Sequence, residues 1–446
     1  MNILLINIDT LRADHLHCYG YPKPTSPAID HLASEGALFK RCFAPGIPTT
    51  PAHTTLYTGL HPIQHNIVSH GGSAELDHKC LVLPQLLQEA GLTTCAVDNL
   101  YDIKPWLARG YEFYINPSFH HRMRLLISCE EVNRRAIPWI KQHANETFFL
   151  FVHYWEPHTP YLPPMRYRNF YNGGDPFNPS NHGLEPMKRQ PFWKMWEDTW
   201  FRKLGPVTDP EFIASLYDGE IRHVDDGIAE LMEALDQAGI AEETLVILLS
   251  DHGEMMYRHD IFFDHHGLYE DNVHVPLMMR WPGHIKPGLR VTVGAQHLDI
   301  LPTLLNRISE EARERVNRRL TYPLDGIDLW PYLSDGGAAE WRDVVLCENT
   351  WQSKWGLRTE SQKLILSREP DHHGMPMREL YDLKADPGEE HNLVEEQPER
   401  AAMLEARLEG WIASELKRGG KTADPLVTQP ITLGQRWLTF QPAAAN

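Results

Sequence analysis

The sequence lacks cysteine motifs, a secretion signal and long apolar runs. None of its six cysteines belongs to a CxxC pair. The first residues show neither a basic n-region nor a signal-type apolar segment, so we expect reduced thiols and a cytoplasmic location. No segment approaches the roughly 20 apolar residues that a membrane span needs. The sequence therefore predicts a protein with no membrane partner.

Positive charge is scarce as well: 42 Lys and Arg stand against 60 Asp and Glu, which gives a formal net charge of −18. This balance predicts no nucleic-acid partner, because nucleic-acid-binding proteins carry a basic face. Internal repeats and low-complexity segments are missing too. What remains is the composition of an ordinary globular protein, and its 446 residues suffice for one large core and a smaller subdomain.

Continuous apolar runs at residues 3–8, 147–153 and 244–249 are typical of strands buried on both faces of a parallel sheet. A further strand is predicted at 93–97. Helical periodicity is clearest at 211–238. We therefore predict an α/β fold in which helices flank a mostly parallel central sheet.

From about residue 345 the sequence pattern changes to short strands and one helix. We therefore divide the chain into a large domain, residues 1–344, and a smaller α+β subdomain with a tail, residues 345–446. The subdomain is predicted to hold a hairpin at 355–366, a helix at 399–416 and a loop-like end. Within the large domain, residues 162–210 are rich in Pro, Asn, Gly, Arg and Trp and show little periodicity. Such an irregular insertion is either a lid or partner surface, or a variable loop.

Polar residues follow the apolar runs where the predicted strands end. Asp9 follows the first run, and Asp251 with His252 follows the last. The carboxyl ends of parallel strands meet at one edge of a sheet, so we expect these side chains to lie close together. Two carboxylates and an imidazole suit a hard or borderline divalent cation. Each acid alone could cap a helix, but their shared position favours a metal site.

Thr49 and Thr50 stand at the beginning of a segment that can form a helix. Free N–H groups and the dipole at a helix N-terminus stabilise an oxyanion, which suits a nucleophile. Threonine is also a common N-cap residue. This segment alone therefore leaves capping and catalysis open.

Four motifs, in order along nearly the whole chain, resemble sulfatase-like members of the alkaline phosphatase superfamily. Residues 7–16, NIDTLRADHL, resemble the opening of these proteins, and SDHGE at 250–254 resembles their second metal motif. TTPAH with LYTG, within 49–59, falls where they carry Cys/Ser-x-Pro-x-Arg and Leu-Thr-Gly. Residues 379–393 look like their C-terminal signature.

The resemblance implies the alkaline-phosphatase/sulfatase-like fold, with residues 1–344 as the catalytic domain. It also implies a divalent metal ion (Zn, Mn or Ca) held by Asp9, Asp251 and His252, with Thr49 as a further ligand. Members with two metal ions often carry Asp-x-x-x-His, which this sequence lacks. We therefore expect one ion per chain.

Two positions depart from the family pattern. Sulfatases convert the first residue of Cys/Ser-x-Pro-x-Arg into formylglycine, but here that residue is Thr49, and His53 replaces the arginine. Threonine cannot be oxidised to the required aldehyde. The resemblance therefore shifts towards the branch that uses an unmodified Thr or Ser, which includes nucleotide phosphodiesterases and phosphoethanolamine transferases.

The resemblance assigns roles to further residues. His158 matches the histidine that contacts the transferred group or the leaving oxygen, and His265 falls near the family's second lysine. Titratable imidazoles at these places suit general acid catalysis, although a solvated loop is the alternative for His265 and His266. The candidates for substrate binding are Asn99, Tyr101 and Lys104, from the region of the family's first lysine, and His266.

These observations predict a metal-dependent hydrolase of phosphoesters, either phosphodiesters or phosphonate monoesters, with Thr49 as nucleophile. The expected partner is a small anionic ester, and a homo-oligomer is left open. Three alternatives remain: a hydrolase of sulfuric esters, a phospho-group transferase, and a non-catalytic binding relative.

Overall fold

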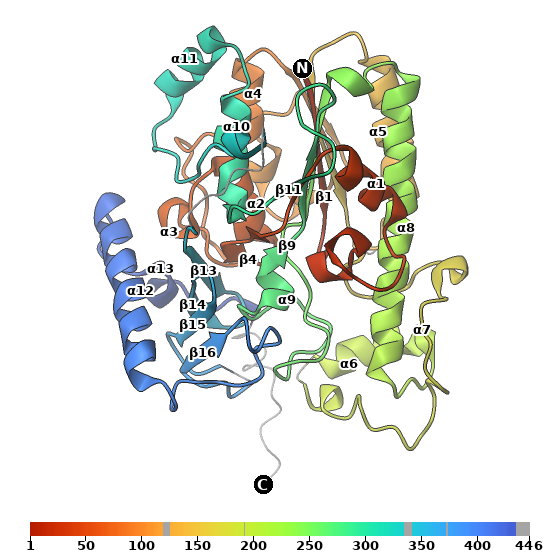
Figure 1. The fold of residues 1–446 in the computed structure, drawn as a ribbon, viewed down its shortest axis with the longest axis vertical. Coiled ribbons are helices and arrows are strands. Elements are labelled where there is room, and N and C mark those ends of the chain that lie inside the picture. Colours follow the sequence, from red (N-terminus) through yellow and green to blue (C-terminus); the bar gives the residue numbers. More distant parts are fainter. Residues whose placement is uncertain (119–124, 191, 334–340, 372, 434–446) are drawn as a thin grey trace.

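The structure is a computed structural model that describes residues 1–118, 125–190, 192–333, 341–371 and 373–433 (Figure 1). Its centre is an eight-stranded mixed sheet with the strand order β11-β2-β10-β8-β1-β7-β5-β6. The strands of this sheet are β1 (Asn2–Ile8), β2 (Ala37–Phe39), β5 (Thr93–Val97), β6 (Phe113–Ile115), β7 (Phe148–Tyr154), β8 (Thr244–Leu249), β10 (Leu277–Arg280) and β11 (Leu289–Val291).

The middle of the sheet is parallel, because β6, β5, β7, β1 and β8 pair in the same direction. All residues of β1, β7 and β8 are buried, as the continuous apolar runs predict. β10 pairs antiparallel with β8 and β2, which makes the sheet mixed at one side. In register, Asn7 lies between His153 and Leu249. The residues that follow these strands therefore emerge together.

Helices cover both faces of the sheet (Figure 1). The helix α8, predicted at 211–238, is Pro210–Gln237; the Asp209 side chain accepts a hydrogen bond from the backbone N–H of Glu211 and caps it. α1, α5 and α8 cover one face, and α2, α4 and α10 the other. The bounds are α1 (Pro27–Glu35), α2 (Thr49–Thr58), α3 (Pro62–His65), α4 (Leu83–Glu89), α5 (Cys129–Gln142), α9 (Glu270–Val273), α10 (Ile300–Leu305) and α11 (Glu310–Arg319).

A five-stranded sheet, ordered β16-β15-β14-β13-β4, forms the C-terminal subdomain. The predicted hairpin is present as β14 and β15, which pair antiparallel. The predicted C-terminal helix is present as α12, which packs Leu404, Leu408 and Ile412 against the sheet. The bounds are β13 (Val344–Asn349), β14 (Ser353–Arg358), β15 (Gln362–Ser367), β16 (Arg378–Asp382) and α12 (Pro398–Arg418).

The N-terminal domain also contributes a strand to this sheet, because β4 (Gly46–Ile47) pairs with β13 immediately before α2 begins. The C-terminal sheet thereby holds the start of α2 in place. A third, small sheet joins β12 (Ala295–Gln296), β3 (Cys42–Phe43) and β9 (His274–Val275). β9 is followed at once by β10, so the chain passes from this small sheet into the central sheet within two residues. The predicted division after residue 344 stays a prediction.

The insertion at 162–210 contains more helix than its sequence indicates. α6 (Trp193–Trp196), a π-helical turn (Glu197–Phe201) and α7 (Arg202–Leu204) follow one another without a break. The segments are too short to show a helical period. They are anchored by Trp200, which is fully buried and packs edge-on against Tyr161 and Phe263. Residue 191 lies outside the described residues.

The predicted loop-like end of the chain includes one short helix, α13 (Pro425–Thr428). Residues 434–446 of the predicted tail lie outside the described residues. Among the described residues, every helix is too short or too polar to cross a lipid bilayer. Figure 1 shows that the insertion and the C-terminal sheet flank the end of the central sheet at which β1 finishes.

Candidate active site

The structure brings Asp9, Asp251 and His252 together at the carboxyl ends of β1 and β8. Each offers one ligand atom, and these atoms all lie within 4.8 Å of one another. The Nε2 of His252 is 3.3 Å from an Asp251 oxygen and 3.9 Å from Asp9 Oδ1. All three residues are buried. The adjacency predicted from the strand ends is therefore present.

The chemistry of this cluster fits a divalent cation. Asp9 Oδ1 and Asp251 Oδ2 are buried and have no hydrogen-bond partner among the described residues. Burial, together with the charges of Asp251 and Glu254, raises the pKa of Asp9 well above its usual value. Burial also raises the pKa of Asp251. A bound cation would compensate these carboxylates and keep both of them ionised.

His252 is oriented as a metal-binding histidine would be. Its Nδ1 lies 3.0 Å from the Gly253 carbonyl oxygen, which accepts a hydrogen bond from an Nδ1–H group. The Nε2 lone pair then faces the two carboxylates, as in sites where a second hydrogen bond fixes the tautomer of the ligand. Burial lowers the pKa of His252 to about 4, so the ring is neutral near pH 7.

Thr49 is the first residue of α2. The N-cap is Pro48 and there is no side-chain cap, so the Thr49 hydroxyl does not cap the helix. Its Oγ1 instead lies 3.3 Å from His252 Nε2. The hydroxyl therefore borders the carboxylate–imidazole cluster at a helix N-terminus, where backbone N–H groups can hold an anionic oxygen.

His53, one helical turn after Thr49, also belongs to this group. Its Nδ1 is 2.9 Å from the Thr49 carbonyl oxygen and 3.6 Å from an Asp251 oxygen. Burial lowers the pKa of His53. The position of the family arginine is therefore taken by a neutral ring and not by a fixed cation.

His158 and His265 continue the site as a row of rings beside His252. The ring centres of His158 and His265 are 4.7 Å apart, and those of His265 and His252 are 5.1 Å apart. Burial lowers the pKa of His158 to about 4 and that of His265 well below its usual value. His265 is largely buried rather than placed in a solvated loop, with 17% of its side chain exposed.

Two histidines outside the predicted set complete the site. His153 Nε2 lies 3.2 Å from Asp9 Oδ2, and His70 Nδ1 lies 2.9 Å from the Thr50 hydroxyl. His153 could have been found from the sequence, because it is the last residue of the apolar run at 147–153, and in β7 it lies beside Asn7. His70 sits among serine and glycine residues and gives no comparable signal.

The four predicted substrate-binding residues are less closely grouped than the residues around Asp9, Asp251 and His252. The Asn99 side-chain oxygen accepts a hydrogen bond from Trp155. Lys104 donates to the carbonyl oxygens of Gly72 and Ala74. Tyr101 is 51% exposed. The Nε2 atoms of His266 and His373, which belongs to the C-terminal subdomain, are 2.8 Å apart.

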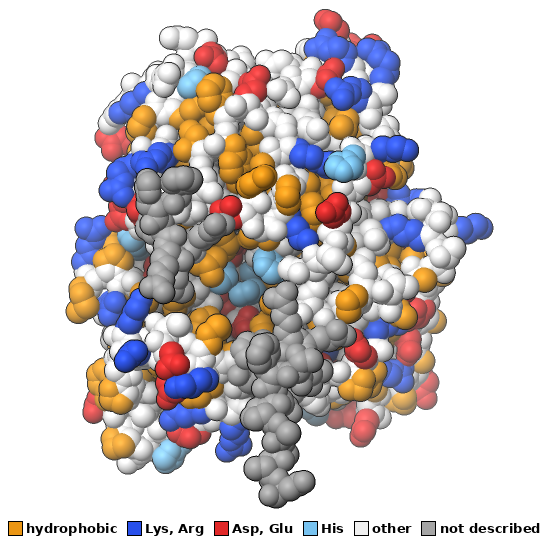
Figure 2. Space-filling model, turned by 180° about the vertical axis from the view of Figure 1, so that it is seen from behind, with side chains coloured by type: hydrophobic (Ala, Val, Ile, Leu, Met, Phe, Trp, Pro, Cys, Tyr) orange, Lys and Arg blue, Asp and Glu red, His pale blue; other side chains and the backbone are white. Residues whose placement is uncertain are grey.

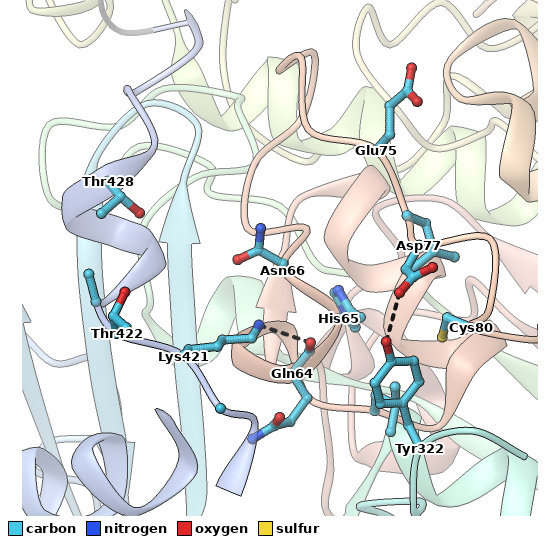
Figure 3. Close-up of a pocket in the computed structure, with 14 residues that line it drawn as sticks. Gln64, His65, Asn66, Glu75, Asp77, Cys80, Tyr322, Lys421, Thr422 and Thr428 are labelled. Carbon is cyan, nitrogen blue, oxygen red and sulfur yellow. Dashed lines mark hydrogen bonds between the residues drawn. The ribbon is translucent and has the colours of Figure 1, made fainter. Parts of the chain in front are cut away.

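Two cavities with different linings help to locate the substrate pocket. In Figure 2, histidine side chains gather in a hollow near the centre of one face. A cavity of about 240 Å³ is lined by His158 together with Leu162 and Pro164 of the insertion. A separate cavity of about 500 Å³ contains none of the predicted site residues; Lys421 and Tyr322 in its wall hydrogen-bond to Gln64 and Asp77 (Figure 3).

Comparisons with known proteins agree with this architecture. The profile of the sulfatase family matches residues 1–309, and the profile of the N-sulphoglucosamine sulphohydrolase C-terminal region matches residues 258–414. The chain is 24% identical to the multifunctional alkaline phosphatase superfamily protein PehA of Trinickia caryophylli, over 98% of this chain and 99% of that protein. It is 22% identical to an N-acetylglucosamine-6-O-sulfatase of Bacteroides thetaiotaomicron, over 88% of this chain and 82% of the relative.

Among solved structures, the phosphonate monoester hydrolase of Agrobacterium radiobacter has the same fold. The TM-score is 0.69 at 22% identity, over 93% of this chain and 96% of that one. The two profile matches together span residues 1–414 and therefore include both the central sheet and the C-terminal sheet. The chain belongs to the sulfatase family of the alkaline phosphatase superfamily and is a hydrolase of that superfamily.

Proposed function

We propose that the protein is a metal-dependent hydrolase of phosphodiesters or phosphonate monoesters and that Thr49 is its nucleophile. The observation that carries this proposal is the position of the Thr49 hydroxyl, 3.3 Å from His252 Nε2 at the start of α2. Threonine cannot supply the aldehyde of formylglycine. An unmodified hydroxyl at this position favours attack on phosphorus over the usual route of sulfatases.

Asp9, Asp251 and His252 would hold one divalent ion. Bound there, the ion would supply Lewis-acid stabilisation of charge and favour ionisation of a nearby hydroxyl. Thr49 Oγ1 then forms a bond to phosphorus while the bond from phosphorus to the leaving alcohol breaks. Water hydrolyses the resulting ester of Thr49 in a second step. The backbone N–H groups at the start of α2 stabilise the anionic phosphoryl oxygens.

His158 is suited to carry the proton between these steps. Its Nδ1 lies 2.7 Å from the Thr159 carbonyl oxygen, so Nδ1–H is the donor and Nε2 carries the lone pair of the neutral ring. Nε2 therefore accepts a proton before it gives one to the leaving oxygen. His265 lies beside it and is the alternative carrier.

We also propose that the insertion forms a wall of the substrate pocket. Leu162 and Pro164 line the cavity that His158 borders, which supports this role. The similarity to an N-acetylglucosamine-6-O-sulfatase keeps hydrolysis of sulfuric esters as the second candidate, and PehA and the phosphonate monoester hydrolase support the first.

The test is a panel of aryl substrates with zinc- or manganese-loaded protein: a phosphodiester, a phosphonate monoester and a sulfate. We expect turnover of the first two. Thr49→Ala should lower kcat by about 10³-fold or more, as removal of other nucleophiles does. Thr50→Ala is the matched control and should lose far less. Turnover of the sulfate ester alone would favour the second candidate, and wild-type turnover by Thr49→Ala would contradict the assigned nucleophile.

A further inference from the structure

A second group of carboxylates around an imidazole lies behind the proposed reaction centre. Glu156 follows β7, and Glu220 and His223 lie on adjacent turns of α8. One ligand atom of each lies within 4.8 Å of the others. Residues three apart on a helix point to the same side, so Glu220 and His223 form a Glu-x-x-His pair of the kind that binds metals in helical proteins.

The imidazole of His223 has a free ring nitrogen that faces this group. His223 is 3% exposed, and its Nδ1 has no hydrogen-bond partner among the described residues. Nδ1 lies 3.6 Å from Glu156 Oε1 and 3.9 Å from Glu220 Oε2. These separations are too long for hydrogen bonds, which span about 2.7–3.2 Å. They are close to the roughly 3.4 Å between ligand atoms around a tetrahedral ion with bonds of about 2.1 Å.

The proposed reaction centre gives an internal reference for these distances. There the imidazole nitrogen is 3.3 and 3.9 Å from the two carboxylates. In the second group the corresponding distances are 3.6 and 3.9 Å. The two groups therefore have the same donor types at nearly the same separations.

The surroundings of the second group hold its ligands in place without satisfying them. The backbone N–H group of Cys129 donates to Glu156 Oε1, and that of Leu162 donates to Glu220 Oε1. The other oxygen of Glu156, Oε2, is buried without a hydrogen-bond partner in the described part of the chain. His223 Nε2 lies 2.8 Å from Glu130 Oε1. A carboxylate on the outer nitrogen is the usual support of a metal-binding histidine.

Lysine and arginine act on this group only at longer range. In the described ranges none of them forms an ion pair with Glu156 or Glu220, although the charge of Arg168 favours ionisation of Glu220. A divalent ion would therefore supply the positive charge that the two buried carboxylates do not receive from a paired lysine or arginine.

We propose that Glu156, Glu220 and His223 bind a second divalent transition-metal ion, with the chemistry of Zn²⁺. The imidazole favours zinc over calcium or magnesium. Three protein ligands leave a coordination position open. All three ligands also line the cavity of about 240 Å³ that reaches His158, so this position is accessible to water and to small molecules.

The experiment counts zinc ions. Protein stripped with a chelator is loaded with zinc, passed through gel filtration and analysed for zinc per chain. Wild type should hold two ions, and Asp251→Ala and Glu220→Gln should each hold one. Glu233→Gln, the same exchange at an exposed position on α8, is the matched control and should hold two. Cobalt added to Asp251→Ala should give the visible absorption of a tetrahedral ion, and Glu156→Gln is a second variant should Glu220→Gln fail to fold.

The outcomes separate this proposal from the proposed reaction. One ion in wild type and none in Asp251→Ala would overturn the second site and leave the first intact. One ion in wild type and in Asp251→Ala, with none in Glu220→Gln, would support the second site and contradict the first. Far-UV circular dichroism identical to wild type is required of each variant that is counted.

Discussion

The two carboxylate–imidazole groups differ in how the chain builds them. Asp9, Asp251 and His252 come from residues that directly follow adjacent parallel strands. Glu156, Glu220 and His223 come from one strand end and from the middle of a long helix. The first group is visible in the sequence because strand ends can be located from apolar runs. The second is not, because its pairing depends on how α8 packs against the sheet.

Their surroundings differ as well. The first group borders the Thr49 hydroxyl and the N-terminus of α2, so an ion there acts beside a nucleophile. The second group borders a cavity, and its histidine is supported by Glu130 from outside. We infer that the two groups have different roles although their ligand types are the same. The Thr49 hydroxyl beside the first group gives that group its role in the reaction.

The largest expected effect comes from breaking the first group. Asp251→Ala should lower kcat on a phosphonate monoester by about 10³-fold or more, because the ion and the ionised hydroxyl are both lost. Glu220→Gln should lose less, because Glu220 does not belong to the group beside Thr49. Steady-state kinetics of the two variants measure this difference. Equal losses would show that the two groups act as one unit.

Substitutions of Thr49 and Thr50 compare two neighbouring hydroxyl groups, of which only the first borders the Asp9–Asp251–His252 group. Thr49→Ser should keep part of kcat, because the oxygen remains while the methyl group that restricts χ1 is lost. Thr50→Ala loses a hydrogen bond to His70, which we expect to alter KM or stability more than kcat. Kinetics at saturating substrate, together with thermal unfolding, separate these effects. Complete inactivity of Thr49→Ser with intact metal content would contradict a role for the hydroxyl oxygen alone.

A smaller effect is expected on the pH dependence of stability of metal-free protein. The pKa values of Glu156 and His223 are raised in the folded state to about 8 and about 9. Protons on these groups therefore stabilise the fold at low pH. That contribution is lost as the pH rises from about 4.5, the unfolded value of Glu156, through about 9.

Denaturant unfolding of metal-free wild type and Glu156→Gln between pH 5 and pH 9 would measure this loss. The variant should lose less stability with rising pH than wild type, because its amide does not ionise. Zinc should reduce the pH dependence of wild type. Parallel curves for the two proteins would show that Glu156 does not retain its proton in the folded state.

Much of the fold could be predicted from the sequence. The strands β1, β5, β7 and β8 and the helix α8 have strong apolar patterns, and the structure places them within about two residues of the predicted bounds. β4 could not be predicted, because a two-residue strand has no period and its paired residues in β13 are 301 positions later in the sequence. The helical part of the insertion was missed because aromatic packing around Trp200 holds it, rather than an apolar stripe.

The candidate site likewise contains residues that the sequence predicts and residues that it does not. Asp9, Asp251, His252 and Thr49 were predicted together and lie together, because each is tied to a strand end or a helix start. His70 stands in a segment without regular structure, which has no pattern to read. Histidines such as this one are placed by tertiary contacts, here the hydrogen bond with Thr50.

The most direct test of the central claim is to trap the intermediate on Thr49. Zinc-loaded wild type is mixed with an aryl phosphonate monoester, quenched with acid during turnover and digested for peptide mass spectrometry. We expect one phosphonyl group on the peptide that contains Thr49, with fragmentation that places it on Thr49, and no such group in Thr49→Ala. An unmodified Thr49 during turnover, combined with wild-type turnover by Thr49→Ala, would contradict the account and identify water as the nucleophile.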